Sequence, residues 1–261
     1  MTLSECVIFT VLLVSASIGG LLIVRHWMLA AELKSQHDVA DPLSQVVGMM
    51  FAVLLGFMVG DAMQRFSQAR ATAQQEAASL SDVFHLAEGV PPAERAVIRK
   101  LCVRYAEEVV REEWPLMAEK KTSPHAQATF AELSKVCATY EPKSQGQSNV
   151  QQTLLPSVVS LGDNRRLRVE ALNNGLPMAL WVVLVVGGLA TILFTYFFGA
   201  GNLKIQLVMV AIVTLVISLN IFLLASYDDP FSGDVMVHPS AFETDLRVFE
   251  NEAAQPVIEQ K

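Results

Sequence analysis

Residues that could shape an ion pathway recur at every fourth position of one hydrophobic stretch, as Met49, Val53, Phe57 and Asp61. Steps of four keep side chains on one face of a helix. Several such faces brought together would form an apolar pore constriction with a ring of carboxylates beneath it. On periodicity alone, packing of this face against neighbouring helices is the stronger interpretation. Asp61 could also extend to the membrane interface without any role in conduction.

A second polar group, Asp228 and Asp229, ends another hydrophobic run and is followed by Pro230 and Phe231. Adjacent carboxylates on an extended chain point apart, so this pair is a poor acid–base site. Proline lacks an N–H and restricts the residue before it, so Pro230 is predicted to end a helix.

Other catalytic patterns are missing from the sequence. The five histidines and three cysteines show no metal-ligand spacing, and no phosphate-binding glycine loop or serine-nucleophile motif occurs. The net charge of −7 provides no basic surface for nucleic acid. We therefore expect no enzyme, no metal, no cofactor and no nucleic-acid partner.

The composition indicates a protein of the lipid bilayer. Hydrophobic residues make up 52% of the chain and charged residues 17%, against about 25% charged in soluble domains. Four windows are long and apolar enough to cross a membrane, which takes about 20 helical residues. These are residues 6–29, 43–63, 178–198 and 205–226. The predicted fold class is an all-α membrane protein with four transmembrane helices.

The segment between the second and third windows, residues 64–177, is predicted to be a helical domain. It is broken at residues 89–92 and 124, with a polar loop at 142–153. One apolar stripe recurs at helical spacing in Ile98, Leu101, Cys102, Tyr105 and Val109. Such a small domain cannot bury all its stripes alone, so we expect a homo-oligomer, with a monomer as the alternative.

Charge asymmetry predicts the topology. Four spans place both termini, the 64–177 domain and the 227–261 tail on one side. That side carries Arg65, Arg70, Arg165, Arg166 and Arg168, whereas the opposite loops hold Arg25, Lys34 and Lys204. The positive-inside rule then predicts a cytoplasmic domain and tail, in a multi-pass protein of the bacterial inner membrane.

Two motifs resemble those of the bestrophins. The stretch LLGFMVGDAMQRFSQAR is similar to the second-span signature, carried here by Leu55, Gly56, Phe57, Arg65, Phe66, Ala69 and Arg70. The second motif is carried by Asp229, Pro230, Phe231 and Gly233. The four-span layout with its helical insert is similar too, and resembles more closely the bacterial bestrophin-like proteins grouped as a domain of unknown function.

The resemblance implies a pentameric ion channel. In the bestrophins, three apolar residues of span two at spacing four line the pore neck, and by position these are Met49, Val53 and Phe57. The resemblance also implies that the Asp-Pro-Phe segment folds the tail against a cytoplasmic helix near the gate. Phe231 would then be an apolar anchor. Asp228 and Asp229 would lie at the membrane surface, capping groups or pairing with Arg65 or Arg70.

Two departures from the family bear on ion chemistry. Some animal bestrophins follow the Pro-Phe segment with an acidic calcium clasp, whereas only Asp234 lies close by here, so we expect no calcium gating. Asp61 stands where bacterial bestrophins carry a basic or polar residue, and a ring of carboxylates favours cations. Arg65, one turn further along, could neutralise that ring.

The sequence thus predicts a homo-oligomeric channel that passes small monovalent ions passively, with a lean to cations. Its partners would be the lipid bilayer, small inorganic ions and copies of the chain. Two alternatives remain: an anion-selective channel of the same architecture, and a non-conducting membrane scaffold or sensor with a cytoplasmic partner.

Overall fold

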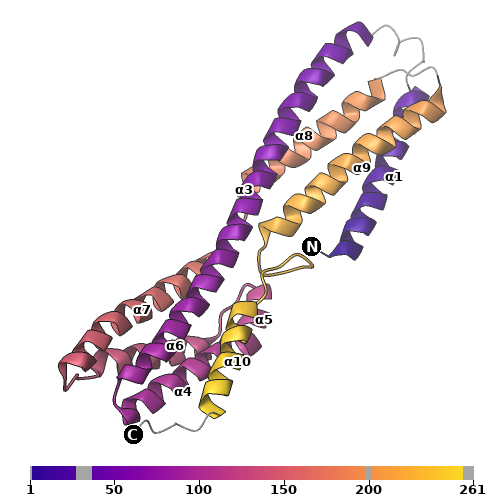
Figure 1. Cartoon of the computed structure of the whole chain (residues 1–261). Coiled ribbons are helices and arrows are strands. Elements are labelled where there is room, and N and C mark those ends of the chain that lie inside the picture. Colours follow the sequence, from indigo (N-terminus) through magenta and orange to yellow (C-terminus); the bar gives the residue numbers. More distant parts are fainter. Residues whose placement is uncertain (1, 28–36, 198–201, 255–261) are drawn as a thin grey trace. The chain divides into compact units, whose positions relative to one another are not determined.

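The computed structural model of the chain describes residues 2–27, 37–197 and 202–254, and every regular element in those ranges is a helix (Figure 1). The chain divides into two compact units. The membrane unit comprises residues 1–65, 175–229 and 233–235, and the second unit comprises residues 66–174, 230–232 and 236–261. Helix α3 (His37–Leu86) contributes its first part to the membrane unit and the rest to the second unit.

The membrane unit holds the described parts of four helices: α1 (Leu3–Trp27), α3, α8 (Met178–Phe197) and α9 (Leu203–Asp228). All four are long and apolar enough to cross a bilayer, so the predicted all-α class with four membrane helices is confirmed. Residues 28, 29 and 198, which would complete the expected first and third spans, lie outside the described residues.

Hydroxyl groups and glycines bring the helices of the membrane unit together. The Tyr196 hydroxyl on α8 donates to the Ser17 carbonyl on α1 at 2.8 Å, and Thr214 Oγ1 on α9 donates to Ser17 Oγ at 2.9 Å. A Cβ at Gly20 would lie 2.8 Å from the Tyr196 hydroxyl, and one at Gly187 would lie 2.8 Å from a ring carbon of Phe51. Small residues and interhelical hydroxyl bonds replace the hydrophobic driving force that lipid cannot supply.

The second unit is a bundle of shorter helices packed around the later part of α3. Its elements are the 3₁₀ turn Ala87–Gly89, α4 (Pro92–Glu108), a π-helical turn Val109–Glu113, α5 (Trp114–Ala118), α6 (Pro124–Thr139), α7 (Gln145–Glu170) and α10 (Ser240–Ala254). Pro92 at the first position of α4 tolerates its missing N–H there, which explains the break after Gly89.

The apolar stripe predicted on α4 is buried inside this unit. Ile98, Cys102, Tyr105 and Val109 have no exposed surface, and Leu101 is 5% exposed. The unit therefore buries its own stripes, and these stripes do not require a second copy of the chain. The expectation of an oligomer must rest on another surface.

The polar segment 142–153, expected to be a loop, is helical from Gln145 onward. Ser144 caps helix α7 by accepting a hydrogen bond from the N–H of Gln147 at 3.2 Å. Most glutamine, asparagine and serine side chains of this first part are exposed or partly exposed, and the fully buried positions of α7 begin at Leu154. Composition therefore misled the prediction, because a solvated helix turn and a loop use the same polar residues.

Candidate functional site

Helix α3 carries the predicted constriction residues on a face that the described chain leaves uncovered. Met49, Val53 and Phe57 are 72%, 53% and 75% exposed. The opposite face, with Phe51 and Leu55, is buried in the membrane unit. These three side chains are therefore not packed against the other described helices of the same chain, and are available to lipid or to another copy.

Small residues run beside that stripe, one position earlier at each turn. Gly48, Ala52, Gly56 and Gly60 are also spaced by four. A Cβ at any of the three glycines would meet nothing within 4 Å. Gly20 and Gly187 allow a neighbouring side chain to approach closely, whereas no part of the described chain approaches these three glycines.

Asp61 and Arg65 form an ion pair at the end of this stripe. Arg65 Nη2 lies 2.9 Å from Asp61 Oδ2 and 3.8 Å from Asp228 Oδ1. The same Asp228 oxygen accepts a hydrogen bond from the N–H of Leu176 at 2.7 Å. Asp228 therefore ties the end of α9 to the chain that enters α8, and Arg65 lies between two carboxylates.

The Pro-Phe segment leaves α9 and packs within the second unit. Asp229 is the extended residue that ends α9. Phe231 is 1% exposed, and its ring meets the Trp114 ring edge-on with centroids 5.8 Å apart. The Trp114 indole donates to the Val237 carbonyl at 2.9 Å, and the Val237 N–H donates to the Pro230 carbonyl at 2.8 Å. Phe231 thus occupies a buried aromatic site, within a turn that one backbone hydrogen bond closes and the Trp114 indole holds to α5.

Asp234, which belongs to the membrane unit, caps a helix of that same unit. Its Oδ2 accepts a hydrogen bond from the N–H of Leu3, the first residue of α1, at 2.6 Å. Gly233 precedes it with a φ of 85°, a conformation that favours glycine.

The Arg-aromatic motif is divided between the two units. Arg65 belongs to the membrane unit, whereas Phe66 and Arg70 belong to the second unit. Phe66 packs against the core of the second unit, and Arg70 is exposed. A common role for the three residues stays a prediction.

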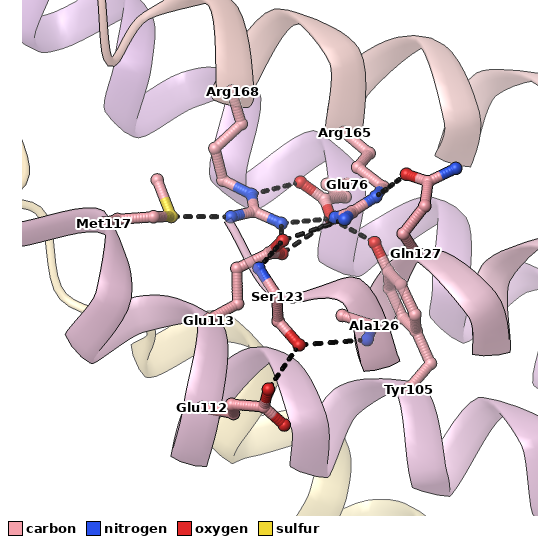
Figure 2. A network of polar contacts seen from close by, with 10 residues as sticks. All are labelled: Glu76, Tyr105, Glu112, Glu113, Met117, Ser123, Ala126, Gln127, Arg165 and Arg168. Atoms are coloured by element: carbon pink, nitrogen blue, oxygen red, sulfur yellow. Dashed lines mark hydrogen bonds and ion pairs between the residues drawn. The ribbon is translucent and has the colours of Figure 1, made fainter. Parts of the chain in front are cut away.

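A buried network of charges in the second unit, which the sequence did not reveal, joins α3, α4, the π-helical turn and α7 (Figure 2). Arg168 of α7 donates to Glu76 of α3 at 2.6 and 2.9 Å and to Glu113 at 2.7 Å. Arg165 donates twice to Glu113, at 2.8 Å each, and the Tyr105 hydroxyl donates to Glu76 at 2.6 Å. Two guanidinium groups thus balance two carboxylates.

Burial and charge act together on the acid–base properties of this network. Glu76, Glu113 and Arg168 have no exposed surface. Burial alone would lower the pKa of Arg168, but the Glu76 and Glu113 carboxylates outweigh it and hold that pKa above the ordinary value. Burial raises the pKa of Tyr105, and the charge of Glu76 raises it further. Tyr105 therefore stays neutral and acts as a hydrogen-bond donor.

The π-helical turn Val109–Glu113 positions Glu113 in the network. Tyr105, Val109, Glu113 and Met117 are four residues apart, and none has exposed surface. Four-residue steps drift around an α-helix of 3.6 residues per turn, so they would leave the buried face. The wider π turn compensates for this drift and keeps Glu113 facing α7.

Arg165 and Arg168, which the topology prediction counted as charges flanking the membrane, are buried in this network at 4% and 0% exposure. A signal for their burial existed in the sequence. Leu154, Val158 and Leu161 form a helical stripe, and the next two positions of that stripe are Arg165 and Arg168. Arginines that continue an apolar stripe need buried carboxylate partners.

Comparisons with known proteins agree with this architecture. A family model described as a bestrophin-like domain matches residues 11–242. The solved structure of a bacterial bestrophin homolog from Klebsiella pneumoniae is 13% identical and covers 96% of this chain and 99% of that chain, with a TM-score of 0.71.

A mutant structure of that Klebsiella pneumoniae bestrophin homolog is 16% identical, with 98% of this chain and 99% of that chain covered and a TM-score of 0.70. A further solved membrane protein matches at 13% identity, 97% and 100% coverage and a TM-score of 0.67. A comparison with curated proteins gives no match. Identities this low establish a shared fold and transfer no residue role.

Proposed function

The chain belongs to the bestrophin-like family, and from this membership we propose that it is a homo-oligomeric channel for small monovalent ions. It is a multi-pass membrane protein related to the bestrophin channels. A pentamer is the oligomer that the family resemblance implies. Each copy would contribute α3 to a central pathway, with Met49, Val53 and Phe57 as the constriction.

The uncovered face of α3 is the observation that carries this proposal. In a ring of α3 helices, the small residues Gly48, Gly56 and Gly60 would let a neighbouring helix approach closely. The large stripe, about 100° around the helix from the small one, would then project toward the axis. A face sealed within the chain would have favoured a non-conducting scaffold, and these side chains are exposed instead.

The ion pair between Asp61 and Arg65 bears on ion sign. The Asp61 side chain is 59% exposed and that of Arg65 is 27% exposed. The carboxylate thus offers more of its surface to the proposed pathway, and we keep the preference for cations on that basis. An anion-selective pore is the competing outcome, because Arg65 offsets the charge of Asp61.

The contacts of the tail favour a role for it close to the pore helix. Arg65 lies within ion-pair distance of both Asp61 and Asp228, the last residue of α9. Three residues later, Phe231 is buried against Trp114. We therefore keep Asp228, Asp229, Pro230 and Phe231 as the proposed anchor of the tail at the gate.

The proposed location is the bacterial inner membrane, with both termini and residues 64–177 in the cytoplasm. This topology now rests on fewer charges, because Arg165 and Arg168 serve the buried network. Arg65, Arg70 and Arg166 remain on the proposed cytoplasmic side, against Arg25 and Lys204 opposite. Lys34 lies outside the described residues.

The test is a reversal potential measured with purified protein in planar bilayers under a potassium chloride gradient. Current that reverses near the potassium equilibrium potential supports the channel and its cation preference, and reversal near the chloride potential supports the anion-selective alternative. Silence from protein that is inserted and oligomeric would overturn the channel and favour the scaffold.

Variants locate the pathway in the same recordings. Replacing Met49, Val53 and Phe57 by alanine is expected to raise the leak current, because it widens the apolar constriction. The matched control replaces Val185, Leu189 and Leu193 of α8, which are also spaced by four and 48–52% exposed. Equal currents from both triple variants would remove α3 as the constriction. Asp61→Asn should shift the reversal potential away from the potassium equilibrium potential.

A further inference from the structure

A cavity in the second unit has the chemistry of a site for a small organic carboxylate. Its volume is about 220 Å³, and it lies between α3, Trp114 and the segment 236–242, which enters α10. It is separate from the α3 face proposed to line the pore.

Polar and apolar side chains are separated within this cavity. Its apolar floor is buried, with Ala73, Trp114, Val237 and Phe242 at 5% exposure or less. Its polar residues are exposed and form the mouth: Arg70, Gln74, His238 and Ser240. A ligand that fits this arrangement has an apolar body and one polar end that remains near solvent.

The polar end that the mouth selects is anionic. Arg70 is positively charged, and no aspartate or glutamate lines the cavity. Among the described residues, no hydrogen bond or ion pair engages the side chains of Arg70, Gln74 or His238, so their donors are free for a ligand. A guanidinium binds a carboxylate through two parallel hydrogen bonds.

The backbone adds to this preference. The cavity is lined by Ser240, Ala241 and Phe242, the first residues of α10. The first N–H groups of a helix have no carbonyl partner within it and favour negative charge. The Trp114 indole N–H is already bonded to the Val237 carbonyl, so Trp114 offers the cavity its ring.

We propose that this cavity binds a small monocarboxylate whose apolar body contacts Trp114 and Phe242 and whose carboxylate pairs with Arg70. The single arginine at the mouth suits a single negative charge. A phosphate, with more charge and no apolar part, would leave the aromatic floor unused.

The experiment is calorimetric titration of the purified full chain in nanodiscs with benzoate. Benzamide serves as the uncharged isostere and inorganic phosphate as the competing anion. We expect saturable benzoate binding, no binding of benzamide and no competition by phosphate. Arg70→Gln should weaken benzoate binding roughly tenfold or more, because it removes a charge-assisted pair. Arg70 is exposed, so the variant should fold.

The matched control is Arg166→Gln on α7, which also removes an exposed arginine but lies outside the cavity. It should bind benzoate as the wild type does. The proposal is overturned if benzoate shows no saturable binding even when its concentration is raised well above about 1 mM, a Kd at the weak end of small-ligand affinity. It is equally overturned if Arg70→Gln binds unchanged or if phosphate displaces benzoate. Because no current is measured, such a failure leaves the channel proposal standing.

Discussion

The guanidinium of Arg168 contacts Glu76 at 2.6 Å and Glu113 at 2.7 Å without any exposed surface. It also donates to the Met117 sulfur at 2.8 Å and lies 5.2 Å from the centre of the Trp114 ring. Breaking a buried pair leaves an uncompensated charge, which costs more than the pair itself contributes. This residue therefore tests whether the network holds the second unit together.

We predict that Arg168→Met lowers the free energy of unfolding by about 3–5 kcal/mol, because Glu76 and Glu113 lose a shared partner in a dry interior. Arg166→Met, two positions away, is the control, since Arg166 is 78% exposed and should change stability by less than about 0.5 kcal/mol. Denaturant unfolding of both variants in detergent measures the difference. Equal stabilities would show that the network contributes little.

For single residues, burial could be predicted from the sequence only where a periodic pattern within one helix marked it. The apolar stripe of α4 follows a period and was identified correctly. Glu76, Glu113 and Arg168 are far apart in the chain, and only the packing of α3, the π-helical turn Val109–Glu113 and α7 brings them together. The apolar stripe of α7 indicates that Arg168 is buried, but it does not indicate which carboxylates Arg168 meets.

Among the elements, α10 is held by an aromatic stack and by ion pairs. Phe249 stacks on Phe84 of α3 with centroids 4.0 Å apart, and Glu252 lies 3.1 Å from His85 and 3.5 Å from Arg99. Asp245 Oδ2 is buried without a hydrogen-bond partner among the described residues. Burial raises the pKa of Asp245 to about 6, although nearby His85 acts in the opposite direction.

We predict that acidification strengthens the docking of α10. The pKa of Asp245 is higher in the docked state than its ordinary 3.8, so docking favours the protonated form. The stabilisation of the docked state by protonated Asp245 is complete below the ordinary pKa of 3.8, and it is lost as pH rises through about 6. Amide exchange over residues 240–252, corrected for intrinsic rates, should therefore slow as pH falls.

Asp245→Asn should reduce this pH dependence, because asparagine carries no charge to bury. An exchange rate in the Asp245→Asn chain that follows pH as steeply as the wild type would exclude Asp245 as the titrating group.

For the whole molecule, hydropathy was sufficient to predict four spans, since the length and apolar content of a span do not depend on its partners. The boundary between the two units was not predictable in the same way. Helix α3 runs from His37 to Leu86 without a break, so no local signal marks the change at Arg65. The reasoning from the insert's stripes also failed, because α3, α4 and α7 bury one another's stripes within one chain.

The remaining support for an oligomer is the small face of α3, formed by Gly48, Ala52, Gly56 and Gly60. A substitution at one of these glycines can test whether this face contacts another copy of the chain. A Cβ at Gly56 meets nothing within 4 Å, and leucine has a better helix propensity than glycine, so Gly56→Leu should be harmless to a single chain. In a ring of close-packed α3 helices the added side chain would separate the neighbours. We therefore predict a smaller assembly for Gly56→Leu, measured by native mass spectrometry.

Gly19→Leu on α1 is the matched control, since its Cβ also meets nothing within 4 Å. It should keep the wild-type mass, because the proposed ring is built by α3 and not by α1. If Gly56→Leu keeps that mass too, the small face contacts lipid and not another copy of the chain. Met49, Val53 and Phe57 on the adjoining stripe would then not face a central axis. A loss of assembly in Gly56→Leu alone would place the subunit contact on α3, one helix face away from the proposed constriction.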